Sequence, residues 1–269
     1  RLQTRDDQMP FQVKYASVML VAVPPVDGAA PPLFTTVFTQ DGVHIAALSE
    51  GRDTLESKTI AYQTIDAVAT SPDGSNLFYC GVTDGRPFLA VAPAFHHGPP
   101  EVVFLARACE HLAVSEDEVL VFDTTNGLNM YSFDLEFQSH RSSTHDYRAV
   151  AVMPGGKHLC AVRKEASDIW SQGPAKMWTL RSLKVGRLAE TIEQVSVHGS
   201  SVFFAGSTTI TVAEVDDQDN IRLPQPFIPT IRSDHEIEAF TVSSSSDGHY
   251  DVYGAGDGWL THWGVSEKD

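Results

Sequence analysis

Short turn signals recur along this chain at a nearly constant interval, and this periodicity limits the fold more than any other feature of the sequence. The first series lies at positions 27, 73, 117, 155, 199 and 247, with spacings of 46, 44, 38, 44 and 48 residues. A second series follows shortly after the first and includes Asp41-Gly42, Asp84-Gly85, Asn126-Gly127 and Asp257-Gly258. Asp-Gly and Asn-Gly favour tight β-hairpins, because these residues tolerate the positive φ that the turn requires. The two interleaved series indicate one supersecondary unit that is repeated six times.

Between the turns, apolar residues alternate with polar ones in short runs rich in Val, Phe and Tyr, which is typical of β-strands. The segment closest to a helical pattern, 169–188, is interrupted by Gly173, Pro174 and Gly186. The chain is therefore expected to be all-β. The strand-like runs include residues 12–23, 33–38, 77–82, 119–122, 148–153 and 202–205.

The length of the repeat indicates the architecture. A unit of about 44 residues with about four strands is the size of one blade of a β-propeller. One blade cannot bury both of its faces, so the blades must pack against each other in one domain. The sequence predicts a six-bladed β-propeller of four-stranded antiparallel blades in a single domain over 1–269. The predicted blades cover approximately 11–62, 65–105, 109–142, 145–190, 192–228 and 235–269.

Two local motifs resemble the WD40-repeat family. Ser71-Pro72-Asp73-Gly74 is similar to the turn between the first two strands of a WD40 repeat. The segment 254–263, which ends in Trp263, is similar to the hairpin between the second and third strands. His235, 28 residues before Trp263, lies where the family has its Gly-His dipeptide. His145 and Trp178, 33 residues apart, repeat this relation in the fourth unit.

In that family the His, the turn Asp and the Trp form a network of side chains that ties strands together. The resemblance places such a network on His235, Asp257 and Trp263, and in part on His145 and Trp178. The match is degenerate, since only the second, fourth and sixth units carry recognisable motifs. The departures from the family pattern are Asp234, Tyr253, Gly264 and Thr179.

The last repeat lacks a fourth strand. After its third predicted strand only residues 266–269 remain. Three arrangements are compatible with this: residues 1–9 close the blade, the chain is truncated, or a partner adds a strand to an open edge. The third arrangement resembles the open propellers of vesicle-coat and nuclear-pore scaffolds.

Charge and motifs limit the chemistry. The formal net charge of −16 argues against direct binding to nucleic acid. The longest apolar run, Val18 to Val23, is far shorter than the ~20 residues that a membrane span needs, so membrane insertion is not expected. The sequence contains no nucleophile elbow, phosphate-binding loop or zinc-protease motif. His96-His97 is interpreted as part of a solvated loop, and we expect no catalytic residues, metal or cofactor.

The three cysteines, Cys80, Cys109 and Cys160, stand singly in or beside apolar runs. Such usage is typical of buried, unpaired cysteines in a reducing compartment. A cytoplasmic or nuclear location is therefore predicted.

The segment 163–176 is interpreted as a long connection between the second and third strands of the fourth blade. It contains Trp170, and an exposed Trp on a loop is a frequent hot spot of binding. The alternative is that Trp170 folds back onto its own blade. The residues predicted to contact a partner are Trp170, Ile169, Arg163, Lys164, Trp259 and Arg86.

These features favour a non-catalytic protein–protein interaction platform, a WD40-like subunit of a multiprotein complex that binds one or more protein partners. The alternative from another class is a six-bladed propeller that binds small molecules or hydrolyses lactones with a metal. A platform is expected to expose an apolar or aromatic patch, whereas the enzyme is expected to gather several carboxylates at the propeller axis.

Overall fold

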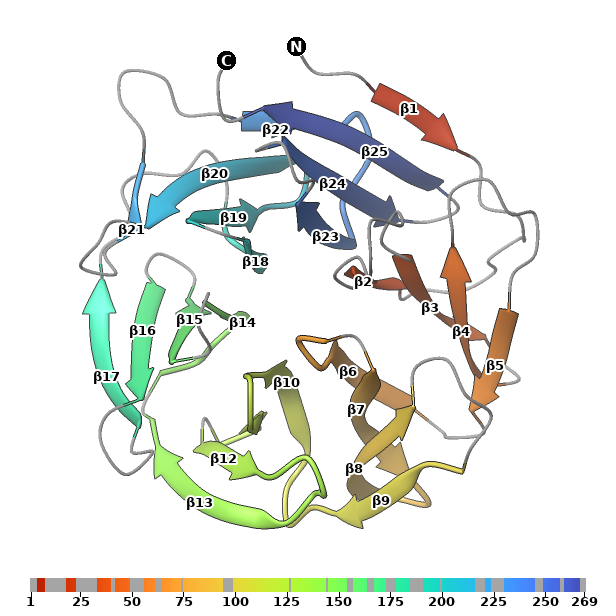
Figure 1. Ribbon diagram of the computed structural model, residues 1–269, viewed down its shortest axis with the longest axis vertical. Coiled ribbons are helices and arrows are strands. Elements are labelled where there is room, and N and C mark those ends of the chain that lie inside the picture. Colours follow the sequence, from red (N-terminus) through yellow and green to blue (C-terminus); the bar gives the residue numbers. More distant parts are fainter. Residues whose placement is uncertain are drawn as a thin grey trace. The chain divides into compact units, whose positions relative to one another are not determined.

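The computed structural model of the chain contains only strands as regular elements in the part that it describes (Figure 1). Side chains are described for 64–73, 75–93, 99–125, 127–143, 145–153, 157–163, 168–172, 191–198, 200–215, 221–223, 230–242, 250–256 and 261–265. The backbone alone is described for the strands β1 to β5 and β17, and for the residues at the ends of strands that lie outside those ranges. No helix in this described part is long and apolar enough to cross a membrane.

The chain divides into two compact units, residues 141–237 and the remainder. The larger unit holds four antiparallel sheets, each of four strands. Their members are β2 (Val18–Ala22), β3 (Leu33–Thr39), β4 (Gly42–Leu48) and β5 (Glu56–Ile60); β6 (Thr64–Thr70), β7 (Asn76–Thr83), β8 (Arg86–Pro93) and β9 (Glu101–Phe104); β10 (Cys109–Val114), β11 (Val119–Asp123), β12 (Gly127–Tyr131) and β13 (Phe137–Ser142); and β1 (Thr4–Asp7), β25 (Trp259–Ser266), β24 (His249–Gly256) and β23 (Ala239–Ser244).

The smaller unit holds two antiparallel sheets. The first has four strands and the second has five. They comprise β14 (Ala149–Val152), β15 (His158–Val162), β16 (Ser167–Gln172) and β17 (Trp178–Leu183), and then β18 (Gln194–His198), β19 (Ser201–Ala205), β20 (Thr209–Val215), β21 (Ile221–Arg222) and β22 (Thr230–Arg232).

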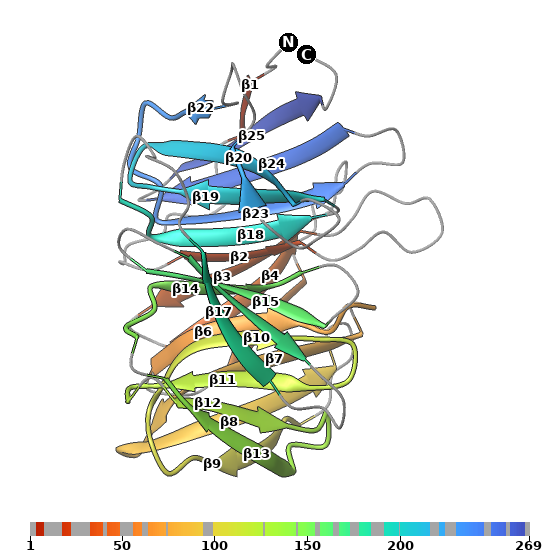
Figure 2. The same ribbon diagram turned by 90° about the vertical axis from the view of Figure 1, so that its left-hand side faces the viewer.

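Most of the strands pair with the strand that follows them in sequence, so that one sheet after another is a four-stranded meander. Figure 2 shows this from the side for β11, β12 and β13. The first strands of neighbouring sheets contact each other, β6 with β10 and with β2 in one unit and β14 with β18 in the other. This is a β-propeller arrangement, and the all-β prediction is confirmed. Five sheets include residues with described side chains, whereas the sheet β2 to β5 is described by backbone alone.

The hairpin between β7 and β8 shows why the turn series identified the repeats. Asp84 has φ 49° and Gly85 has φ 71°, so both central residues occupy the left-handed region. This backbone matches the right-handed twist of the flanking strands. The predicted Asp84-Gly85 hairpin is confirmed.

Strand β1 occupies the outer edge of the last sheet. Its backbone pairs antiparallel with β25, with Thr4 opposite Trp263 and Asp7 opposite Leu260. The predicted closure by the N-terminal segment is therefore confirmed. Because β1 takes the hydrogen-bonding edge of β25, the alternative in which a partner strand fills that edge is wrong for this structure.

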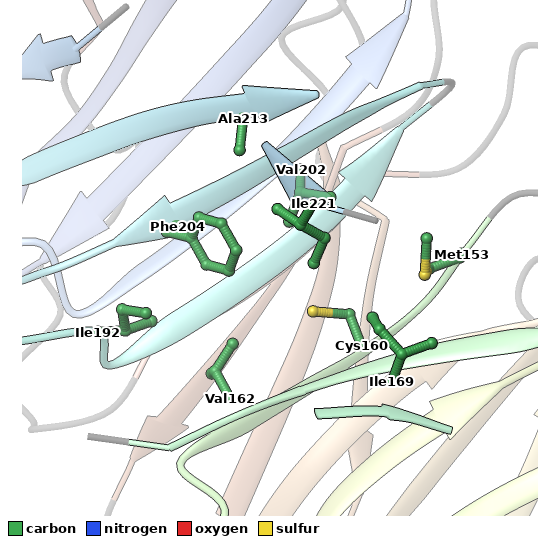
Figure 3. Close-up of a cluster of buried hydrophobic side chains, with 9 residues drawn as sticks. All are labelled: Met153, Cys160, Val162, Ile169, Ile192, Val202, Phe204, Ala213 and Ile221. Carbon is green, nitrogen blue, oxygen red and sulfur yellow. The ribbon is translucent and has the colours of Figure 1, made fainter. Parts of the chain in front are cut away.

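The cores lie between neighbouring sheets. In the smaller unit, Cys160, Val162 and Ile169 of one sheet face Val202 and Phe204 of the next (Figure 3). In the larger unit, a second cluster joins the sheet β6 to β9 with the sheet β10 to β13. Strands that are apolar on both faces, such as Val119–Asp123, fill these layers, since every residue of that strand is buried.

A disulfide fastens two of these sheets together. Cys80 of β7 and Cys109 of β10 are bonded, with their Cα atoms 6.1 Å apart. The expectation that all three cysteines are unpaired is wrong, because strands from two consecutive repeats bring these two side by side. Cys160 is free and buried, and its burial raises the pKa of the thiol to about 12, with a further contribution from the charge of Asp168.

Gly81 allows β6 to approach β7 at a register shift between Ile65 and Ala67. A Cβ at position 81 would overlap the carbonyl oxygen of Thr64 and lie 2.8 Å from Cα of Ile65. Gly81→Ala should therefore lower the free energy of unfolding by about 1–3 kcal/mol. The matched control is Gly264→Ala in β25, because a Cβ there meets nothing within 4 Å. Equal effects of the two substitutions in urea unfolding would contradict this packing.

Candidate binding site

A cavity of about 570 Å³ lies in the larger unit, beside the sheet β10 to β13 and the chain that runs from β9 toward it. Its walls combine apolar and aromatic side chains with a few polar groups, which is typical of ligand sites. The lining residues are Val103, Phe104, Leu105, Ala106, Arg107, Val121, Asp123, Asn129, Tyr131, Leu135, Phe137 and His140.

The rim of the cavity is aromatic and exposed. Phe104 is 50% exposed and Phe137 is 58% exposed, and with Val102 they are the exposed large hydrophobic residues in the described part of the chain. They lie on β9 and β13, the outer strands of their sheets. Phe137 packs edge-on against Tyr131, with ring centroids 5.6 Å apart. We call Phe104, Phe137 and Tyr131 the aromatic rim.

Arg86 belongs to the same surface. Its guanidinium carbon lies 3.6 Å from the ring centroid of Phe104, a cation–π contact. Arg86 was predicted to contact a partner, and the structure places it next to this cavity. Its role in binding stays a prediction.

The polar part of the cavity centres on the carboxylate of Asp123, at the end of β11. Oδ1 accepts hydrogen bonds from the backbone N of Thr125 (2.8 Å), from Thr125 Oγ1 (2.6 Å) and from the backbone N of Gly127 (3.2 Å). Oδ2 accepts one from Asn129 Nδ2 at 2.9 Å. Burial alone would raise the pKa of Asp123, but these hydrogen bonds outweigh it and the pKa is lowered. Asp123 is therefore an anion at neutral pH.

The basic side chains that line the cavity bond to other groups. Arg107 donates from Nη1 to Thr125 Oγ1, and His140 Nδ1 lies 2.9 Å from Asn129 Oδ1. The negative charge also acts on Tyr131, whose pKa is raised by burial first and by Asp123 second. The donors to Asp123 in the described part of the chain are thus all neutral.

Asp123 gives the protein a defined response to acid. Its folded pKa lies below the ordinary 3.8, so its contribution to stability is complete above pH 3.8 and is lost as the pH falls through the folded value. Wild type should therefore exceed Asp123→Asn in free energy of unfolding by more at pH 7 than at pH 3. Urea unfolding at both pH values measures this. A difference that is the same at both would contradict the assignment.

A second polar network lies in the smaller unit around the fully buried carboxylate of Asp168 in β16. Oδ2 accepts hydrogen bonds from Tyr147 OH (3.0 Å) and lies 2.6 Å from His145 Nδ1, and Oδ1 lies 2.8 Å from Arg163 Nη2. Trp170 Nε1 donates to Tyr147 OH at 3.2 Å. The network ties β16 to the segment before β14 and therefore has a structural role.

The fourth repeat differs from its prediction. The segment 163–176, expected to be a loop, contains β16, which pairs with β15 and β17. Trp170 is 2% exposed and Ile169 is fully buried, so the expectation of an exposed binding loop is wrong for both. Trp178 begins the fourth strand, β17, and not the third. His145 does join a network, as the resemblance implied, but the tryptophan in that network is Trp170.

The other predicted site residues have varied outcomes. Arg163 pairs with Asp168, whereas Lys164 lies outside the described residues. Trp259 begins β25, but its side chain is not among those described. Their contact with a partner remains a prediction.

The network expected in the sixth repeat is described only in part. Trp263 is 2% exposed in β25, and His235 is exposed, while Asp257 lies outside the described residues. The described neighbour of this region is a pair formed by His262 Nε2 and Asp251 Oδ1, 2.7 Å apart. The predicted network of His235, Asp257 and Trp263 stays a prediction.

Within the ranges whose side chains are described, no group of three or more His, Cys, Asp or Glu residues is placed to hold a metal ion. His96 and His97 lie outside those ranges.

The fold has a counterpart among solved structures. The crystal structure of a functionally unknown protein from Desulfotomaculum acetoxidans DSM 771 is similar to this chain, with a TM-score of 0.59 and 17% sequence identity. The alignment covers 84% of this chain and 77% of that one. At this identity the likeness shows the fold alone. No protein-family model matches the sequence, and no curated protein matches it.

Proposed function

We propose that this protein is a non-catalytic protein–protein interaction platform, a six-bladed WD40-like propeller within a multiprotein complex. The observation that carries the proposal is the aromatic rim with its adjoining cavity. Phe104 and Phe137 each expose half or more of their surface. Exposed aromatic side chains around a recess are typical of surfaces that bind proteins.

The number of blades and the WD40 relationship rest on the repeat and the motifs. Six turn pairs in the sequence correspond to six sheets in the chain order. The Ser71–Gly74 motif precedes β7, as it does the second strand of a WD40 repeat. These features support a six-bladed degenerate WD40-like propeller as part of the proposal.

Affinity purification of the full chain from its native cells tests the proposal. The wild type should retain a stoichiometric partner at moderate salt. The double variant Phe104→Ser/Phe137→Ser should lose that partner by about tenfold or more, because truncating two hot-spot aromatics removes ~2 kcal/mol or more of binding free energy. Glu116→Ser, an exposed change at the far end of β11, should retain it. A wild type that purifies alone, or a double variant that binds normally, would contradict the proposal.

The second candidate is a propeller that binds a small molecule. It is favoured by the cavity volume of about 570 Å³, which lies within the ~300–1,000 Å³ range of ligand pockets. A small apolar ligand that saturates the purified protein and is displaced by no protein partner would favour this candidate. Loss of an activity on addition of a chelator would point to its metal-dependent form.

The cellular location also remains a prediction. The expectation of cytoplasm or nucleus depended on unpaired cysteines, and the Cys80–Cys109 disulfide removes that premise. Disulfides persist mainly in oxidising compartments. Fractionation of the native cells decides between the two.

A further inference from the structure

The buried charge of Asp123 has no opposite charge beside it. The residue is 5% exposed, and its carboxylate is held by a hydroxyl, an amide and two backbone N–H groups. None of these donors carries a charge. Within the described part of the chain, no Lys, Arg or His forms an ion pair with it. Buried carboxylates in proteins are usually paired with a cation, since desolvation of an unpaired charge is costly.

The hydrogen bonds leave one side of the carboxylate less occupied. Oδ1 accepts three hydrogen bonds, whereas Oδ2 accepts one, from Asn129. An ionised carboxylate offers about four acceptor positions on its two oxygens. Arg107, the arginine that lines the cavity, donates to Thr125 on the Oδ1 side. Oδ2 therefore retains capacity for a donor that enters from the cavity.

The walls of the cavity suit a cation with an apolar stem. The faces of aromatic rings attract cations, and the rings of Tyr131, Phe104 and Phe137 all line the cavity. Arg86 already stacks on Phe104, which shows that this rim accommodates a guanidinium. Long basic side chains cover apolar surface with their methylene groups while the charged head reaches a polar group.

The surrounding charge has the matching sign. The chain carries a formal net charge of −16, and exposed acidic residues flank the rim on its own strands and the turn before β13. These residues are Glu101, Asp134 and Glu136. Such a field attracts basic partners and repels acidic ones.

We infer that the cavity receives a lysine or arginine side chain from a basic segment of the partner protein, with the stem against the aromatic rim and the charged head at the Asp123 carboxylate. The inference rests on the proposed function and names the chemistry of the partner. Phe137 and Phe104 would supply contact area, while Asp123 would select a cation.

Three capped peptides in a Gly/Ser background test this inference directly. The first carries a central Arg-Leu-Lys, the second replaces these with citrulline-Leu-acetyl-Lys, and the third carries Glu-Leu-Glu. Amide chemical shifts of ¹⁵N-labelled protein report binding at the residues that line the cavity. The basic peptide should shift the amides of 104–107 and 129–131 and bind at least tenfold more tightly than the other two. Equal binding of the neutral peptide, or tighter binding of the acidic one, would overturn the inference.

A charge variant gives a second, independent readout. Asp123→Asn keeps the shape of the side chain and removes its charge, so affinity for the basic peptide should fall at least tenfold. Glu116→Gln removes one charge from an exposed turn at the opposite end of β11 and should change affinity less than twofold. Equal losses in both variants would mean that net charge alone attracts the peptide, and this would overturn the assignment to Asp123.

The two proposals can fail separately. If the basic peptide does not bind but the native partner still depends on Phe104 and Phe137, the interaction platform stands and the inference about a cation is wrong. If neither the peptide nor the partner depends on the rim, both are wrong.

Discussion

Asp168→Ala should lower the free energy of unfolding by about 3–5 kcal/mol, because it breaks a buried ion pair and leaves its partners unsatisfied. The carboxylate is fully buried and bonds to Arg163, His145 and Tyr147. Without it, the guanidinium of Arg163 loses its counter-ion, and its Nε is already buried without a hydrogen-bond partner. Urea unfolding followed by far-UV circular dichroism measures the change.

An exposed ion pair in the same unit provides the control for Asp168. Arg148 and Glu193 also form a close pair, but their side chains are 37% and 46% exposed. Glu193→Ala should cost about 0–1 kcal/mol, since water replaces the lost contact. If Asp168→Ala costs no more than Glu193→Ala, the network around Asp168 does not hold β16 in place.

The double variant Cys80→Ala/Cys109→Ala should lose about 3–4 kcal/mol of unfolding free energy. The disulfide links residues 29 apart in sequence, and a cross-link of that span reduces the entropy of the unfolded chain by this order. Because it joins β7 to β10, the loss should also appear as earlier exposure of the cluster between those sheets. Thermal or urea unfolding with and without reductant measures it.

Reduction of the wild type provides the matched control for the double variant. Reduced wild type should be destabilised to nearly the same extent, while the double variant should not respond to reductant. Thiol titration of the denatured, unreduced protein should find one thiol, that of Cys160. Three thiols would show that the bond does not form in the protein as isolated.

The repeat could be read from the sequence because it depends on local chemistry. Asp84-Gly85 requires positive φ, and that requirement is visible in two adjacent letters. The alternating runs around it similarly predict strands without any knowledge of their neighbours. The periodicity of such signals was sufficient to predict an all-β propeller arrangement and the closure by the N-terminal segment.

The fourth repeat was misread because its signals are not local. Ser167–Gln172 appears polar, with Asp168 beside Ile169 and Trp170, and this composition favours a loop. Asp168 is buried because Arg163, His145 and Tyr147 satisfy it, and two of these lie more than 20 residues away in sequence. Burial of a charge that depends on distant partners leaves no pattern in neighbouring residues.

The cavity and the disulfide escaped prediction for a related reason. Each combines residues from two consecutive repeats, and the sequence does not show which side chains meet where those repeats pack. Phe104 and Phe137 are ordinary strand residues in the sequence, and only their position on the outer strands β9 and β13 exposes them. The single signal near the site was Asn126-Gly127, which predicted the turn after Asp123 but not the buried carboxylate.

Site-specific crosslinking tests most directly whether the aromatic rim is a protein-binding surface. A photoreactive benzoylphenylalanine replaces Phe137 in one protein and Glu116 in another, and each is illuminated with its native partner bound. Both positions are exposed and belong to the same part of the chain, so they differ in location and not in accessibility. The proposed function predicts a covalent product from position 137 and none from position 116. A bound partner that crosslinks from 116 and not from 137 would contradict it.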